Sequence, residues 1–266
     1  MAARSALYNV MERAARKAAR GLVHDFGEIE NLQVSVKGPA DFVSTADLQA
    51  ERTLKAELGK ARPEFGFLME ETGAVAGDGR HRWIVDPLDG TTNFLHGIPH
   101  FAISIGVERE GEIIAGVVYD PMRDEMFYAE KGFGAFVNDR RLRVSARQQL
   151  GDAVIGTGIP YRERGDHPEY LKLLAQVMAT TAGVRRMGAA SLDLAYVAAG
   201  RFDGFFEIGL SPWDVAAGML LVREAGGYVS DFLTGGGLAK GAPLIACAPG
   251  VKDALVAAVA IEGIVL

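Results

Sequence analysis

The sequence predicts a layered α/β or α+β protein, and three observations support this class. Short β-rich runs separated by turns occupy residues 101–137, whereas strands and helices alternate beyond Val144. The chain of 266 residues is 49% hydrophobic, enough for a substantial core near the upper size of one compact domain. No repeat or linker interrupts it, so we expect a single unit over residues 1–266, with a first lobe over about 1–144 and a second over about 145–266.

The first lobe should contain two long helices and a set of antiparallel strands. Helical spacing of apolar residues predicts an amphipathic first helix, and Ser44 and Thr45 are typical caps for a second helix with Asp47 in its first turn. Runs separated by Gly, Pro and Asn-Asp turns predict an antiparallel meander. The predicted elements are a helix over residues 1–20, a strand over 32–36, a loop over 37–41, a helix over 46–60, and strands over 65–69, 83–85, 101–107, 113–119, 125–129 and 134–137.

The second lobe should alternate strands with helices in layers. Its helix over residues 213–225 ends at Gly226-Gly227, since glycine is the usual residue after a helix. The predicted strands cover residues 153–156, 184–187, 202–208, 228–231 and 244–248, and the predicted helices cover 168–180, 190–199, 213–225 and the C-terminal segment.

Composition argues against several classes of protein. The formal net charge of −6 lacks the excess of Lys and Arg on which a broad nucleic-acid surface depends. An anionic ligand would therefore need a bound divalent cation to attract it. The single cysteine, Cys247, excludes an internal disulfide framework. No apolar run has membrane-spanning length, so we expect a cytoplasmic protein.

One segment, residues 83–93, has the pattern of a strand, a tight turn and the start of a helix. Asp86 and Asp89 flank its Pro turn, so their carboxylates can converge. Gly90 and Thr91 begin the helix, where free N–H groups and the helix dipole favour a phosphate. Turn and cap chemistry alone would explain an isolated motif of this kind.

Other acidic residues strengthen the functional interpretation because they also lie at the ends of predicted elements. Glu70 and Glu71 follow a strand, and Asp214 lies in the first turn of a helix. Hard oxygen ligands without a matching Cys or His set favour Mg²⁺ over zinc. The sequence therefore predicts a phosphate held through bound magnesium.

Residues 83–94 (WIVDPLDGTTNF) and 213–217 (WDVAA) resemble the two signatures of the inositol monophosphatase family, and the similarity extends through nearly the whole chain. The chain looks most similar to the bacterial, SuhB-like branch. The resemblance implies an αβαβα sandwich of the inositol monophosphatase and fructose-1,6-bisphosphatase type, usually homodimeric. It also implies hydrolysis of a small phosphorylated polyol, above all myo-inositol monophosphate, with two or three Mg²⁺ ions and inhibition by Li⁺.

The resemblance further implies roles for individual residues. The expected metal ligands are Glu70, Asp86, the backbone carbonyl of Leu88, Asp89 and Asp214, and the expected phosphate site is Leu88, Asp89, Gly90 and Thr91. The expected catalytic residues are Asp47, Thr91 and Glu70, of which the first two orient the attacking water. Arg185 and Glu207 are expected to face the alcohol part of the substrate. Ala189 departs from the family, which commonly has a Thr or Ser there in contact with the substrate.

Three alternatives remain beside this interpretation. The same chemistry could act on histidinol phosphate, a sugar phosphate or a nucleotide phosphate. A phosphatase with an aspartyl nucleophile uses a D-x-D-x-T motif, but Asp86 and Asp89 are separated by two residues rather than one. A regulatory protein could keep the fold and bind a protein partner that the sequence does not identify.

Overall fold

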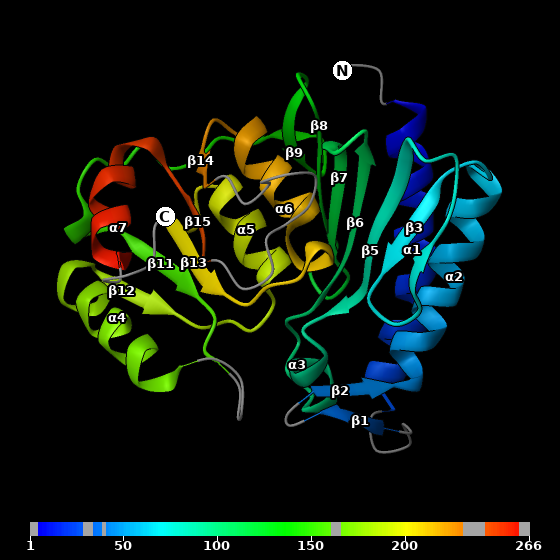
Figure 1. Cartoon of the computed structure of the whole chain (residues 1–266), viewed down its shortest axis with the longest axis horizontal. Coiled ribbons are helices and arrows are strands. Elements are labelled where there is room, and N and C mark those ends of the chain that lie inside the picture. The colour runs from blue at the N-terminus through cyan, green and yellow to red at the C-terminus, as the bar shows by residue number, and fades with distance from the viewer. Residues whose placement is uncertain (1–4, 29–33, 39–40, 161–165, 231–242, 261–266) are drawn as a thin grey trace.

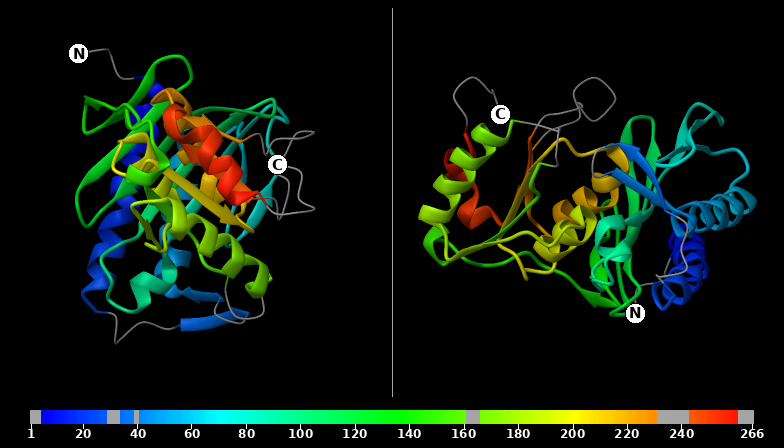
Figure 2. Two further views of the ribbon diagram at one scale, coloured as in Figure 1. Left: turned by 90° about the vertical axis from the view of Figure 1, so that its left-hand side faces the viewer. Right: turned by 90° about the horizontal axis from the view of Figure 1, so that it is seen from below.

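The computed structural model describes residues 5–28, 34–38, 41–160, 166–230 and 243–260. Helices and sheets alternate in the order αβαβα, which confirms the predicted fold class (Figure 1). The outer helices at one end are α1 (Ala6–Phe26) and α2 (Thr45–Ala61), the central helices are α5 (Ala190–Ala198) and α6 (Pro212–Glu224), and the outer helices at the other end are α4 (His167–Thr180) and α7 (Lys252–Val259). The view from below in Figure 2 separates the two outer pairs clearly.

The first sheet has eight strands in the order β10-β9-β8-β7-β6-β5-β3-β4. Its strands β5 to β9 form the predicted antiparallel meander, whereas β3 runs parallel to β5. The bounds are β3 Gly66–Met69, β4 Gly73–Val75, β5 His81–Asp89, β6 Ala102–Arg109, β7 Glu112–Asp120, β8 Glu125–Glu130, β9 Gly134–Val137 and β10 Arg140–Arg141.

The second sheet has five strands in the order β12-β11-β13-β15-β14. Its strands are β11 Val154–Thr157, β12 Gly183–Arg185, β13 Gly204–Ile208, β14 Tyr228–Val229 and β15 Pro243–Cys247. Strand β11 lies between β12 and β13. The strands that carry Arg185 and Glu207 are therefore not neighbours in this sheet. The division into two lobes stays a prediction.

The structure also differs from prediction near the N-terminus. Residues 37–41 were expected as a loop, but residues 37, 38 and 41 belong to β1 (Val34–Gly38) and β2 (Asp41–Ser44), which pair antiparallel; residues 39–40 lie outside the described residues. These strands are short, so the alternation of apolar and polar residues along them is weak, and sequence reasoning did not predict β2. The helix after Gly90 is α3 (Thr91–Leu95), a single short turn of five residues.

The central helix α6 lies very close to the first sheet, and a glycine permits the approach. A Cβ on Gly116 of β7 would lie 2.8 Å from the Cα of Ala217. Val215, Ala217 and Leu221 of α6 are buried in a core that also contains Val118 of β7. This packing fixes the N-terminus of α6, which carries Asp214, against the strand ends of the first sheet.

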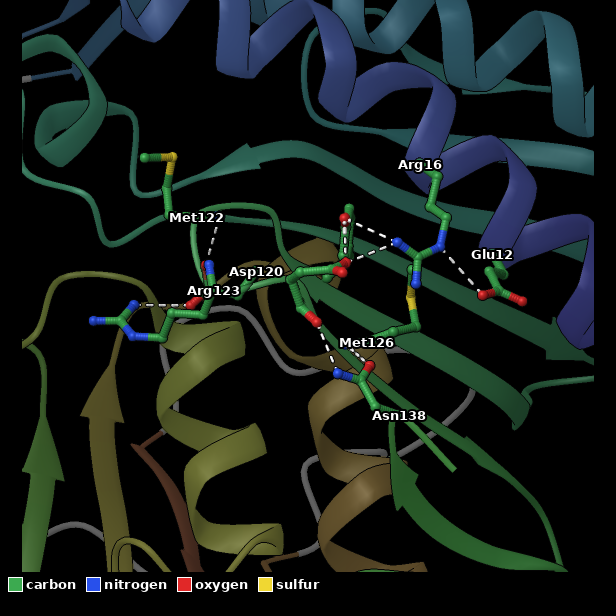
Figure 3. A network of polar contacts seen from close by, with 9 residues as sticks. Glu12, Arg16, Asp120, Met122, Arg123, Met126 and Asn138 are labelled. Atoms are coloured by element: carbon green, nitrogen blue, oxygen red, sulfur yellow. Dashed lines mark hydrogen bonds and ion pairs between the residues drawn. The ribbon is translucent and has the colours of Figure 1, made fainter. Parts of the chain in front are cut away.

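Polar contacts fix the turn between β7 and β8 to its neighbours (Figure 3). Arg16 of α1 donates to Asp124 at 2.8 Å. Within the turn, the side chain of Asp120 accepts from Arg123 at 2.8 Å, and Arg123 also donates to the carbonyl of Pro99 at 3.3 Å. The network therefore links α1 to the loop that precedes β6. Among the described helices, none is both long and apolar enough to cross a membrane.

Candidate active site

The ends of two parallel strands bring Glu70 and Asp86 together. Met69 of β3 pairs with Val85 of β5, and the next residue of each strand is an acid. The amide of Glu70 donates to the carbonyl of Val85 at 3.2 Å, which continues the pairing by one residue. Parallel strands that end at one edge of a sheet place their following side chains side by side.

An irregularity in β5 turns Asp86 and Asp89 toward the same region. The pairing of β5 with β6 shifts register between these two residues. The amide of Leu88 donates to Asp86 Oδ1 at 2.9 Å, which holds the turn. Gly90 follows with φ of 96°, and a Cβ there would lie 3.1 Å from the carbonyl oxygen of His100. Glycine is therefore required both by the left-handed backbone and by the close neighbour.

Residues of the second half of the chain complete this region. Asp89 Oδ2 accepts from the amide of Ser191 at 2.8 Å and from its hydroxyl at 2.5 Å, at the start of α5. Asp214 is the third residue of α6 and forms a capping box with Ser211, whose amide donates to Asp214 Oδ2 at 2.7 Å. Each of the two carboxylates thus has one oxygen held by the fold, which orients the other.

Thr91 and Asp47 form a hydrogen-bonded pair although they come from different helices. The hydroxyl of Thr91 donates at 3.0 Å to Asp47 Oδ1 and lies 3.0 Å from the carbonyl oxygen of Leu88. Asp47 Oδ2 accepts from the amide and hydroxyl of Ser44 at 2.8 and 2.6 Å. Burial raises the pKa of Asp47, and its hydrogen bonds with Ser44 and Thr91 oppose that rise.

One cavity joins most of these side chains. The described residues that line it are Glu70, Asp86, Leu88, Asp89, Gly90, Thr91, Thr92, Gly158, Arg186, Gly188, Ala189, Ala190, Glu207, Leu210 and Asp214. Five of them are acidic and Arg186 is the only cationic residue among them. The cavity therefore gathers negative charge where a negatively charged phosphate would have to enter.

The electrostatics of the acidic residues reflect this concentration. Burial, followed by repulsion from Glu70, Asp89 and Asp214, holds the pKa of Asp86 well above its ordinary range. Burial and then repulsion from Asp89 do the same for the pKa of Asp214. Burial raises the pKa of Asp89 to about 6, against the hydrogen bonds from Ser191. Such groups ionise together only when positive charge is supplied.

The donor set fits magnesium. Four carboxylates and the Leu88 carbonyl are hard oxygen ligands around one cavity, without a Cys or His among the described lining residues. Among the residues that the structure describes, no group of three or more Asp, Glu, His or Cys side chains is arranged closely enough to form a complete metal site. The carboxylates Glu70, Asp86, Asp89 and Asp214 would hold the ion across the cavity and lose their mutual repulsion.

The structure places the two expected alcohol-side residues differently. Glu207 lines the cavity, and burial, followed by repulsion from Asp89, raises its pKa to about 8 against the attraction of Arg186. Arg185 is not among the described lining residues, and its guanidinium donates to the carbonyl of Val184 at 3.0 Å. The role of Arg185 therefore stays a prediction, whereas its neighbour Arg186 lines the cavity.

Several residues at the site were missed by sequence reasoning. Ser191 holds Asp89, and a Cβ on Gly158 would lie 1.9 Å from the carboxyl group of Glu207. Asn93 was read only as part of a signature, although its amide contacts both halves of the chain. Only the position of Asn93 inside residues 83–94 offered a signal. Contacts across the fold have no local pattern in the sequence.

Comparison with known proteins gives consistent results. The model of the inositol monophosphatase family matches residues 3–263. Inositol-1-monophosphatase of Mesorhizobium japonicum is 61% identical over 258 residues, covering 97% of each protein. Inositol-1-monophosphatase of Rhizobium meliloti is 63% identical over 246 residues, covering 92% of each. The crystal structure of extragenic suppressor protein suhB from Bartonella henselae has a TM-score of 0.92 at 57% identity and covers 98% of this chain and 100% of that one.

Proposed function

This chain belongs to the inositol monophosphatase family and is a phosphoric monoester hydrolase, and we propose that it hydrolyses myo-inositol monophosphate to inositol and phosphate with Mg²⁺. One observation supports the metal-dependent chemistry above the others. Four carboxylates face one cavity, one directly after β3, two in β5 and one in α6, and the pKa values of Asp86 and Asp214 are held well above the ordinary range. Relatives at about 60% identity with this activity support the substrate.

We assign the metal-holding groups to Glu70, Asp86, the carbonyl of Leu88, Asp89 and Asp214. When bound, Mg²⁺ would supply positive charge for the phosphoryl and leaving oxygens and would lower the pKa of a bound water. The phosphate would lie at the turn of Gly90 and Thr91, which lines the cavity at the start of α3.

Orientation of the attacking water would be the task of Thr91 and Asp47. Because the Thr91 hydroxyl donates to Asp47 Oδ1, its oxygen can accept a hydrogen bond from a water in the cavity. The amide and hydroxyl of Ser44 donate to Asp47 Oδ2, which leaves Oδ1 to accept from Thr91. As Thr91 Oγ1 takes the proton released by the water, the Thr91 hydroxyl proton would pass to Asp47 Oδ1.

Selection of the alcohol would depend on Glu207. Its carboxyl group lies over Gly158 and lines the cavity with Leu210 and Ala189. A carboxyl group can accept hydrogen bonds from hydroxyls of a polyol. Ala189 has no hydroxyl to add, so Glu207 would be the main side-chain acceptor on this side.

Phosphate release from myo-inositol 1-phosphate tests the proposal directly. We expect turnover with Mg²⁺, none in excess chelator, and recovery when the metal is restored. Full turnover in chelator would contradict the metal assignment. Slow hydrolysis of this ester beside rapid hydrolysis of histidinol phosphate, a sugar phosphate or a nucleotide phosphate would leave the chemistry intact and change the substrate. A trapped phosphoenzyme would instead favour an aspartyl nucleophile.

A regulatory role beside catalysis is a second candidate, because the Bartonella henselae structure carries the name of an extragenic suppressor protein. A variant without phosphatase activity that still performs such a role would separate the two functions. We also propose that the protein is cytoplasmic and that it forms a homodimer, the second of which the family resemblance implies. Light scattering of the purified protein and cell fractionation would test these two points.

A further inference from the structure

The side-chain amide of Asn93 connects three segments of the chain. Its Nδ2 donates to the carbonyls of His100 at 2.8 Å, Met187 at 2.9 Å and Gly188 at 3.4 Å. All three partners are carbonyl oxygens, so Nδ2 and not Oδ1 must face them. Asn93 is buried, with 5% of its surface exposed. The amide therefore ties the end of the phosphate turn to a segment about 95 residues later in the chain.

The same segment makes a close backbone contact with the phosphate turn. A Cβ on Gly90 would lie 3.3 Å from the carbonyl oxygen of Gly188. Gly188 has φ of 88°, and a Cβ there would lie 2.7 Å from Nη1 of Arg186 and 3.1 Å from Nδ2 of Asn93. The guanidinium of Arg186 thus lies against the glycine that Asn93 holds.

We propose that Asn93 is a positioning residue for substrate selection, which fixes residues 187–188 so that Arg186 donates hydrogen bonds to hydroxyl oxygens of a polyol phosphate. Arg186 is the only cationic residue among the described residues that line the cavity, and Glu207 lines the same cavity. Arginine can only donate hydrogen bonds, whereas a carboxyl group has an oxygen that accepts them in either protonation state. The pair would therefore recognise hydroxyls that donate to Glu207 and accept from Arg186.

The inference rests on the proposed phosphatase function and concerns the alcohol half of the substrate. A double-mutant cycle tests it with myo-inositol 1-phosphate and 4-nitrophenyl phosphate, which lacks the hydroxyls. Arg186→Ala should lower kcat/KM for the inositol ester by about 10- to 100-fold, mainly through KM, and should largely spare the aryl ester. Asn93→Ala should show the same selectivity, and the double variant should be no worse than Arg186→Ala alone.

Arg185→Ala is the matched comparison because it removes the same charge one residue away. Three results would each overturn the proposal. The losses of kcat/KM in Asn93→Ala and Arg186→Ala could be additive, the loss could be equal for both esters, or Arg185→Ala could show the selective loss instead. If urea unfolding shows that Asn93→Ala is not folded, Gly188→Ala provides the second test. Its Cβ would displace Arg186 and should cause the same selective loss. A normal kcat/KM for the inositol ester in folded Gly188→Ala would refute the proposal. Failure of the wild type on every phosphate ester would refute the proposed function instead.

Discussion

In the metal-free protein, replacing Glu207 by Gln should raise the free energy of unfolding, and the gain should grow with pH. The reason is the buried position of this carboxyl group, whose pKa rises from 4.5 to about 8 in the folded protein. Between these two values the folded protein keeps a proton that the unfolded chain releases. The folded state then binds more protons, so the free energy of unfolding falls as pH rises.

The magnitude follows from the two pKa values. Each pH unit between them lowers the free energy of unfolding by about 1.4 kcal/mol. Glu207 therefore costs about 3 kcal/mol at pH 7 and about 5 kcal/mol above pH 8, relative to strongly acidic solution. This loss is large beside a typical total stability of about 5–15 kcal/mol. Gln has no proton to release and avoids it.

Urea unfolding in EDTA at about pH 5, 7 and 9 would measure the effect. We expect the two proteins to differ little near pH 5 and the variant to be clearly more stable at pH 9. Glu64→Gln, at an exposed position, is the control for the loss of one negative charge. The reasoning would be refuted if the free energy of unfolding of the wild type and of Glu207→Gln changed equally with pH. That result would show that burial does not disfavour the ionised form of the Glu207 carboxyl group.

Four further predictions concern the reaction. Asp214→Asn should abolish phosphate release while circular dichroism stays unchanged, because an amide keeps the volume but binds Mg²⁺ weakly; retained turnover would remove Asp214 from the metal site. Thr91→Ala should lower kcat by about 10²–10⁴-fold, and a much smaller loss would mean that Thr91 does not orient the water. Gly158→Ala places a Cβ 1.9 Å from the Glu207 carboxyl group and should lower kcat/KM for the inositol ester, whereas Gly151→Ala, with nothing within 4 Å, serves as its control. Li⁺ should inhibit phosphate release, as the family resemblance implies, and an unchanged rate at high Li⁺ would contradict this.

Much of the local structure could be predicted from the sequence. Periodic patterns predicted the meander and the alternation beyond Val144, because the periods of helices and strands depend on residues close together in the sequence. The type of residue at Ser44 predicted the cap of α2. Residues 83–94 pointed to a phosphate turn because turn and helix-start chemistry is also local. The family could be recognised for the same reason, since its signatures are short continuous segments.

Tertiary structure alone decided which distant side chains meet. Arg186, and not Arg185, lies among the described residues that line the cavity, and β12 ends at Arg185, two residues before the predicted end of the strand. The contact of Asn93 with Met187 depends on how the two halves of the chain pack together, and the contact of Gly158 with Glu207 depends on the pairing of β11 with β13. Such contacts join residues tens of positions apart, so no spacing in the sequence encodes them.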